Sequence, residues 1–290
     1  MKEDEELLRA VQNGDLLTVK KLLKNGANVN AKDKDKYSAL HWAVQEGYWH
    51  ICNVLLKGGA NTNAKDKEGF VPLEISASKA HVSVFKLLLK YGADIHIQRA
   101  GFTPLHASAV SGSEEISDIL LSFGIDPNSK DNNGRGRTPL HWASQEGHNG
   151  VARLLLNRGA RINETDENGF TPLHIAASEG HYKLLKFFLE HGANVNAKDG
   201  TGGTALHSAC AWNQKAIAEL LIDRAADINA RDKGGRSPIF FAVMYGYHDL
   251  IKLLLQKGAS ITIRTRKGET LQAIARKTGQ QDIISLLNPL

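Results

Sequence analysis

The sequence predicts an all-α repeat protein, a solenoid of stacked helix–turn–helix units. Two motifs carry this prediction because they recur with one period and in one register, which defines a repeating structural unit. The first usually reads Thr-Pro-Leu-His, and it begins at Ser38, Val71, Thr103, Thr138, Thr171, Thr204, Ser237 and Thr270, in steps of 33, 32, 35, 33, 33, 33 and 33 residues. The second reads Gly-Ala-Asn or a close variant, and it begins at Gly26, Gly59, Gly92, Gly124, Gly159, Gly192, Ala225 and Gly258.

The first motif predicts the start of a short helix. A Ser or Thr hydroxyl caps the free amides of a helix N-terminus, and Pro is favoured at the first helical position. A glycine follows the motif at the distance of about two helical turns, where a left-handed residue ends a helix at least cost. These glycines include Gly47, Gly112, Gly147, Gly180 and Gly246.

A second helix follows each first helix directly. Its apolar residues form a broad face, as in Leu184, Leu185, Phe187, Phe188 and Leu189. One partner helix cannot cover a face of this width. Each unit therefore needs a neighbour on both sides.

The period and the signatures TPLHxA and GADxNA resemble the ankyrin repeat over essentially the whole chain. The resemblance implies an ankyrin-type α-solenoid, with the loops between units projecting as β-hairpin fingers. It also implies that partners bind in a concave groove lined by finger tips and first helices. We expect one domain, 1–290, with an N-terminal cap at 1–32, seven internal repeats at 33–266 and a C-terminal cap at 267–290.

Composition and charge indicate where in the cell the protein is expected. No apolar run approaches the roughly 18 residues of a membrane span, and the N-terminus is acidic, unlike a signal peptide. We expect an intracellular protein, cytoplasmic first and nuclear second, with a secreted effector that lacks a recognisable signal as a further alternative. The net charge of +5 and the pI near 9.1 are a mild basic bias.

Residues able to carry chemistry have a structural explanation in the repeat. Cys52 and Cys210 form no CxxC pair and occupy apolar positions, so we expect buried thiols. The recurrent histidines stand three residues after a cap, where they can bond to it and to the next unit, and the recurrent aspartates suit finger turns. We therefore predict no enzyme, no cofactor and no metal site. The histidines are His41, His106, His141, His174 and His207, and the aspartates are Asp33, Asp66, Asp131, Asp166, Asp199 and Asp232.

Candidate partner contacts are the residues that the scaffold leaves free. Aromatic residues precede the caps, other apolar residues end two first helices, and arginines lie on the fingers, which together resemble interface anchors with a charged rim. The alternative is that some rings cover the adjacent finger; Trp42 and Trp142 are expected in the core. The candidates are Tyr37, Phe70, Phe102, Arg135, Arg137, Phe170, Trp212, Arg236, Met244 and Tyr245.

Two fingers depart from the period. The finger at 132–137 is two residues longer than its equivalents, and the finger around 98–101 is one residue shorter. These changes either distort the groove in the middle of the array or are tolerated loop variation.

The predicted function is a non-catalytic protein–protein interaction module or scaffold. Because basic residues gather on the fingers, the partner is expected to be a protein or peptide of acidic character. The alternative is nucleic acid or another polyanion, since rings among Arg and Lys can also stack bases. The chain itself is expected to be a monomer.

Overall fold

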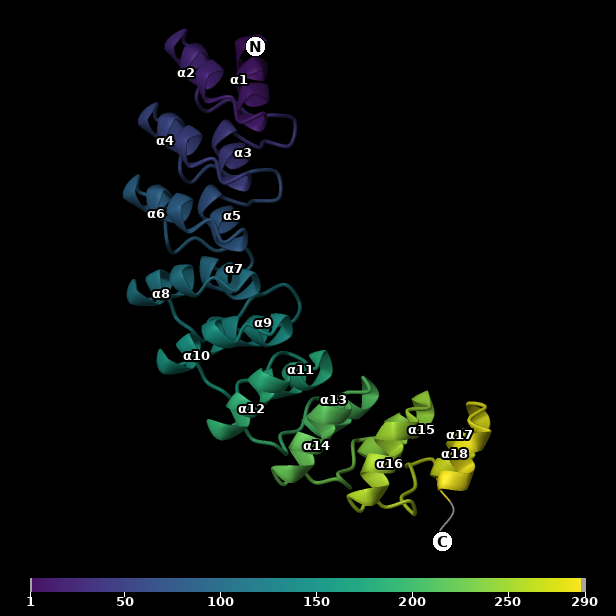
Figure 1. Ribbon diagram of the computed structural model, residues 1–290. Coiled ribbons are helices and arrows are strands. Elements are labelled where there is room, and N and C mark those ends of the chain that lie inside the picture. Colours follow the sequence, from purple (N-terminus) through teal and green to yellow (C-terminus); the bar gives the residue numbers. More distant parts are fainter. Residues whose placement is uncertain (1, 288–290) are drawn as a thin grey trace. The chain divides into compact units, whose positions relative to one another are not determined.

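A computed structural model describes residues 2–287, which form eighteen α-helices and no strand beyond isolated bridges (Figure 1). The first helices of the repeats are α1 (Lys2–Gln12), α3 (Ala39–Gln45), α5 (Pro72–Ser78), α7 (Pro104–Ser111), α9 (Pro139–Glu146), α11 (Pro172–Glu179), α13 (Ala205–Ala211), α15 (Pro238–Tyr245) and α17 (Leu271–Lys277). The second helices are α2 (Leu16–Lys24), α4 (Trp49–Lys57), α6 (Val82–Lys90), α8 (Glu114–Ser122), α10 (Asn149–Asn157), α12 (Tyr182–Glu190), α14 (Lys215–Asp223), α16 (His248–Gln256) and α18 (Gln281–Leu286).

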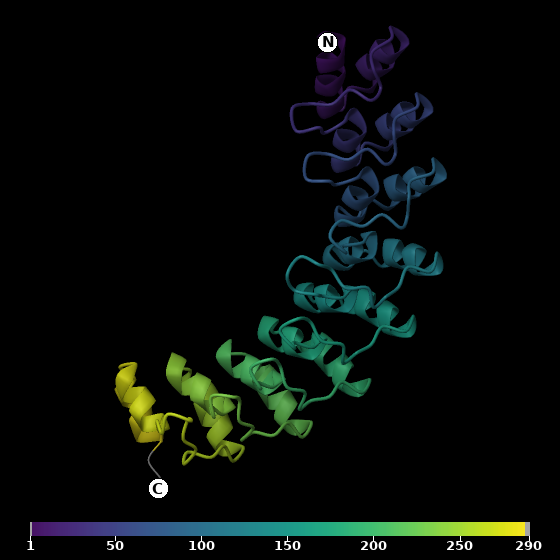
Figure 2. The same cartoon turned by 180° about the vertical axis from the view of Figure 1, so that it is seen from behind.

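The helices cluster in two compact units, Met1–Asn133 and Gly134–Leu290. In unit 1, α1, α3, α5 and α7 contact one another in sequence order, and α2, α4, α6 and α8 form a second row beside them (Figures 1 and 2). In unit 2, the odd-numbered helices from α9 to α17 and the even-numbered helices from α10 to α16 do the same. The prediction of an all-α repeat fold is confirmed.

The fingers are turns rather than β-hairpins in the described residues. Their only strand-like pairings are the isolated bridges Lys32–Ser38 and Arg99–Phe102. The division into one domain with two caps stays a prediction. Met1 and residues 288–290 of the predicted caps lie outside the described residues.

The boundary between the two units falls within the long finger. Asn132 N donates to Ala100 O (2.6 Å) in unit 1, whereas Arg135 O accepts from Glu167 N (2.8 Å) in unit 2. The long finger thus contains the point at which the chain passes from one set of finger contacts to the other.

Each capping-box histidine joins its own cap to the next finger. Thr171 N donates to His174 Nδ1 (3.2 Å), and the Thr171 hydroxyl lies 2.8 Å from the same nitrogen. His174 Nε2 lies 3.3 Å from Gly203 O, 29 residues further on. Because a carbonyl only accepts, Nε2 carries the proton and Nδ1 is the acceptor, so the ring is neutral.

The same arrangement recurs along the array. His41, His141 and His207 reach Phe70 O, Phe170 O and Arg236 O at 3.1, 3.0 and 3.1 Å. His106 reaches Ser129 O instead, just before the long finger. The predicted double role of these histidines, toward the cap and toward the next unit, is confirmed.

The second motif also links neighbouring repeats. Asn30 Oδ1 accepts from Asn61 N and Asn163 Oδ1 accepts from Asn194 N, both at 2.8 Å. Between the two helix rows the core is apolar and includes both cysteines, as predicted. Burial raises the pKa of the Cys52 thiol to about 12 and raises that of Cys210 further, so both thiols stay protonated and unreactive.

The caps are expected to contribute unequally to stability. Thr171→Ala removes a hydroxyl that interacts with His174, so we expect a loss of about 1 kcal/mol in the free energy of unfolding. Ser237 is the matched control, because its buried Oγ has no hydrogen-bond partner among residues 2–287 and Phe240 replaces the histidine. Ser237→Ala should be neutral or slightly stabilising in urea denaturation. Equal losses in the two variants would contradict the capping argument.

Stability is expected to fall in mild acid. Burial lowers the pKa of His41, His174 and His207 in the folded chain, so below about pH 6.5 the unfolded chain binds protons that the folded chain excludes. Above about pH 6.5 the contribution of these histidines to the free energy of unfolding is fully present. Below it, each histidine lowers the free energy of unfolding by up to about 1.4 kcal/mol per pH unit until its pKa in the folded chain is reached. Urea midpoints between pH 7.5 and 5.5 measure this fall. His207→Gln should make it shallower, whereas His96→Gln, at an exposed ring, should leave it unchanged.

Candidate partner-binding surface

The candidate surface of each unit is the face formed by the finger ends and the outward residues of the first helices. We call it the finger face. In unit 2 it comprises finger residues 134–137, 166–170, 199–203, 232–236 and 265–269, together with the outward side of α9, α11, α13, α15 and α17. Two positions recur on it: the pre-cap position is the residue directly before the capping residue, and the ring position is the residue five places after the pre-cap position.

The four predicted pre-cap rings are half-buried and already have neighbours. Tyr37 lies 4.8 Å from the His41 ring and Phe102 lies 5.2 Å from His106 (centroid to centroid). Phe170 packs edge-on against His174 at 5.8 Å. The Arg99 guanidinium covers Phe70 at 3.8 Å from the ring centroid. These contacts favour the alternative that the rings cover adjacent structure.

The prediction that Trp42 and Trp142 lie in the core is wrong. Both are half-buried at the ring position of the finger face. In α3 the buried residues are 39, 40, 41, 43 and 44, which leaves Trp42 and Gln45, three residues apart, on one outward stripe. Trp42 Nε1 donates to Asp33 Oδ2 (3.1 Å), so the indole is held by the finger.

Two of the three predicted arginines are held within the protein. The Arg137 side chain is only 11% exposed: its Nε lies 3.5 Å from Asp166 Oδ2, and its guanidinium lies over the Trp142 ring at 5.3 Å. Arg236 Nε donates to its own finger's Asp232 Oδ2 (2.7 Å), and its guanidinium lies over Phe241 at 4.9 Å. Arg135 is exposed.

The predicted residues at the ends of first helices are the accessible ones. Trp212, directly after α13, is 67% exposed, and Tyr245, the last residue of α15, is 51% exposed. Met244 is half-buried beside Tyr245. Trp212 and Tyr245 are one repeat apart at equivalent positions, so they lie on adjacent helices of the same face.

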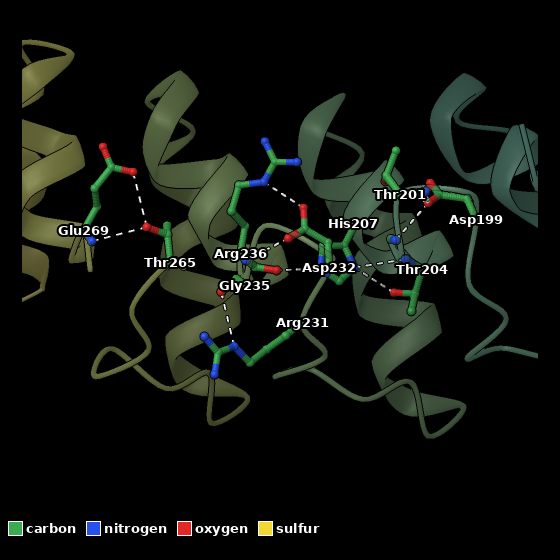
Figure 3. Close-up of polar contacts among 11 residues, drawn as sticks. Asp199, Thr201, Thr204, His207, Arg231, Asp232, Gly235, Arg236, Thr265 and Glu269 are labelled. Carbon is green, nitrogen blue, oxygen red and sulfur yellow. Dashed lines mark hydrogen bonds and ion pairs between the residues drawn. The ribbon is translucent and has the colours of Figure 1, made fainter. Parts of the chain in front are cut away.

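The finger aspartates follow one pattern. In five of the six fingers Oδ1 closes the finger by accepting from its backbone, as when Asp232 Oδ1 accepts from Arg236 N (2.8 Å) (Figure 3). In three of these fingers Oδ2 also meets a side chain of the same face: Trp42 at Asp33, Arg137 at Asp166, and Arg236 at Asp232. The aspartates therefore build the fingers, as predicted, and also hold the groups above them.

Asp199 departs from this pattern. Its Oδ1 accepts from Thr201 N (2.7 Å), the Thr201 hydroxyl (2.8 Å) and Gly203 N (2.9 Å) (Figure 3). Its Oδ2 has no hydrogen-bond partner among residues 2–287. The reason lies in the sequence, because the pre-cap position is Gly203 and the ring position is Ser208, where Arg236 and Phe241 stand one repeat later.

A cavity of about 290 Å³ lies at this place on the finger face of unit 2. Phe170, Trp212 and Phe241 supply aromatic walls. Its charged lining residues are Arg137, Glu179, Asp199, Asp232 and Arg236. The sequence predicted Phe170, Trp212 and the two arginines as partner contacts but missed Phe241, Asp199 and Glu179 as members of a site. The sequence does contain a signal for this site: Gly203 and Ser208 are the only pair of pre-cap and ring residues in which neither side chain is bulky.

The basic finger residues are less free than their number suggests. Lys32 Nζ donates to Lys65 O (3.0 Å), Lys233 Nζ to Gly200 O (2.6 Å), and Arg231 Nη2 to Arg264 O (2.7 Å). These cations link successive fingers. Arg266 and Lys267 are exposed and contact no carboxylate among residues 2–287, so the finger before α17 is the more basic end of unit 2.

The described residues contain neither a cluster of potential metal ligands nor a helix that could span a membrane. Between residues 2 and 287, no three His, Cys, Asp or Glu side chains are grouped so that they could hold a metal ion. Within the same range, every helix is too short or too polar to cross a bilayer.

Comparison with known families agrees with the geometry. A family model described as ankyrin repeats (3 copies) matches residues 7–99, 55–131, 96–166 and 159–232, and one described as ankyrin repeats (many copies) matches residues 212–255. No curated protein matched the chain.

The arginine contacts predict a clear difference between neighbours in the long finger. Arg137→Ala leaves the buried Asp166 carboxylate without its cation and uncovers Trp142, so we expect a loss of about 3 kcal/mol in the free energy of unfolding. Arg135→Ala, at an exposed side chain of the same finger, should change it by less than about 0.5 kcal/mol. Thermal and urea unfolding of the two variants measure the difference. Similar small effects would show that Arg137 is not part of the scaffold.

Proposed function

Because the chain belongs to the ankyrin-repeat family, whose repeats are generally protein–protein interaction modules, we propose that it is a non-catalytic scaffold that binds a protein partner through the finger face of unit 2. The observation that carries the proposal is the pair Trp212 and Tyr245. Two large rings stand exposed at equivalent positions of adjacent repeats, although the neighbouring first helices end in polar residues such as Glu146 and Glu179. Exposed aromatic anchors with a polar rim are typical of interface hot spots.

We propose further that the partner is acidic where it meets the finger before α17. Arg264, Arg266 and Lys267 are exposed there. Opposite charge on the partner would speed association and fix its orientation along the finger face. The acidic character is thus assigned to one part of the contact rather than to the whole face.

Binding of nucleic acid or another polyanion is the competing proposal. It requires several cations that can reach phosphates, whereas Arg137 and Arg236 contact carboxylates and Lys32 and Lys233 contact finger carbonyls. Salt dependence separates the two proposals. Polyanion binding would weaken steeply and linearly with log salt, and protein binding through aromatic anchors would weaken little.

The setting of the interaction also remains a proposal. Cys52 and Cys210 are free, buried thiols, and a chain without disulfides suits the reducing interior of a cell. We therefore propose an intracellular location. The monomeric state is a separate proposal.

Substitution of Tyr245, on the finger face, and of Tyr182, on the second row of helices, tests which surface of unit 2 binds the partner. The partner is first captured from a lysate with the wild-type chain, identified by mass spectrometry and purified for titration. Tyr245→Ala and Trp212→Ala are each expected to weaken its affinity at least about 30-fold, the effect of removing an aromatic hot spot. Tyr182→Ala removes a ring that is 44% exposed at the start of α12, in the second row of helices, and should change the affinity less than about twofold.

Circular dichroism and melting curves of the three variants serve as the folding control. Unchanged affinity in Trp212→Ala and Tyr245→Ala, with normal folding, would overturn the finger face of unit 2 as the binding surface. A larger loss in Tyr182→Ala would move the surface to the second row of helices.

A further inference from the structure

We propose that the cavity between Asp199 and Trp212 receives an arginine side chain of the partner. The inference rests on the proposed function and specifies what one part of the finger face recognises. It is carried by the protein's own side chains, which fill the equivalent place in neighbouring repeats.

Two repeats of unit 2 show which side chain binds beside the Oδ2 oxygen of a finger aspartate. In one, the Arg236 guanidinium bonds to Asp232 Oδ2 and lies over the Phe241 ring. In the other, the Arg137 guanidinium lies beside Asp166 Oδ2 and over the Trp142 ring. Both sites combine a finger carboxylate oxygen, an aromatic face and an arginine from a pre-cap position. Arg236 reaches the aspartate of its own finger, and Arg137 reaches the aspartate of the following finger. The pairing is favourable because a guanidinium is planar, donates in its plane and stacks on rings.

The Asp199 repeat has the carboxylate but lacks the arginine. Gly203 stands at the pre-cap position, and a side chain there would begin 3.0 Å from Asp199 Oδ2. Oδ2 therefore borders the space that the Arg236 stem occupies in the following repeat. The local ring is also absent because Ser208 is small, but Trp212 and Phe241 wall the same cavity.

The charges of the cavity select a cation. Of its five charged lining residues, Arg236 is paired with Asp232, and Arg137 is paired with Asp166 outside the lining. Glu179 and Asp199 remain, and neither has a cationic partner among residues 2–287. The cavity therefore carries two uncompensated carboxylates beside an exposed indole. This combination attracts a guanidinium and disfavours an acidic or apolar side chain.

Other finger carboxylates do not offer the same place. Asp66 also keeps an unbonded Oδ2, but its pre-cap residue is Phe70, and Arg99 already covers that ring. At Asp33 the oxygen is taken by Trp42. The Asp199 repeat is thus the one where carboxylate, ring and space occur together in the described chain.

The probe for the experiment is N-acetyl-arginine amide. Its binding is followed in the uniformly ¹⁵N-labelled full chain through the indole signals of the four tryptophans, with Trp212 assigned by its loss in Trp212→Phe. We expect a saturable shift of the Trp212 indole with a dissociation constant on the order of millimolar, as for a single side chain. N-acetyl-citrulline amide, which has the same shape without charge, should give no saturable shift.

Two substitutions test the residues. Asp199→Asn keeps Oδ1 as acceptor for the finger backbone and removes the charge, so arginine-amide binding should weaken at least tenfold. Gly203→Arg places in this repeat the arginine that position 236 carries, which should fill the cavity and abolish binding. Asp227→Asn changes the net charge equally at an exposed site that does not line the cavity, and should bind as wild type.

The outcomes separate this inference from the proposed function. Equal shifts with the citrulline and arginine probes, or full affinity in Asp199→Asn, would overturn the arginine site. If Tyr245→Ala loses partner binding but the wild-type chain does not bind the arginine probe, the finger face stands as the binding surface and only the arginine site is overturned. If Gly203→Arg does not fold, Asp199→Asn still decides, because it preserves the finger hydrogen bonds.

Discussion

The hydrogen bond from each capping-box histidine to the next finger is the interaction on which the binding face depends. For His41, His141, His174 and His207 it runs from Nε2 to the backbone carbonyl of the next pre-cap residue, as from His207 to Arg236 O, whereas His106 reaches Ser129 O. Because the bond uses the carbonyl, it fixes the position of the pre-cap residue without restricting its side chain. The same point holds Phe170, Gly203 and Arg236 in three successive repeats. The scaffold thus presents a row of positions whose side chains are free to vary.

The sequence predicted most of what is local and repeated. Caps, helix ends and the histidine contacts follow from short motifs, and repetition in one register leaves little room for another fold. Trp42 was misplaced because a helix of two turns has too few residues to define its buried side by periodicity. The contact between Arg137 and Asp166 was missed because it joins two fingers, and nothing in either finger alone indicates which oxygen is unoccupied.

Charge counting gave a coarser answer than geometry. The basic residues on the fingers suggested a positive rim, yet several bind carbonyls or carboxylates of adjacent fingers. The sign of a surface depends on which charges are compensated locally, since a paired carboxylate contributes little field beyond its partner. In unit 2 the uncompensated charges differ along the face: carboxylates near α11 and α13, cations before α17. A partner that fits this face needs both signs in the right order.

Recognition at the Asp199 repeat follows from the absence of an internal arginine side chain rather than from an added group. In the flanking repeats an arginine from the chain itself occupies the finger carboxylate, so these sites are closed to a partner. With glycine at the pre-cap position and serine at the ring position, the carboxylate and the space remain while the occupant is gone. The backbone contacts of the fold are unaffected, because His174 Nε2 still reaches Gly203 O. Each repeat is stabilised mainly by its nearest neighbours, so a vacancy in one repeat costs the others little. A binding site of this kind can therefore arise wherever two small residues replace the internal arginine and its ring.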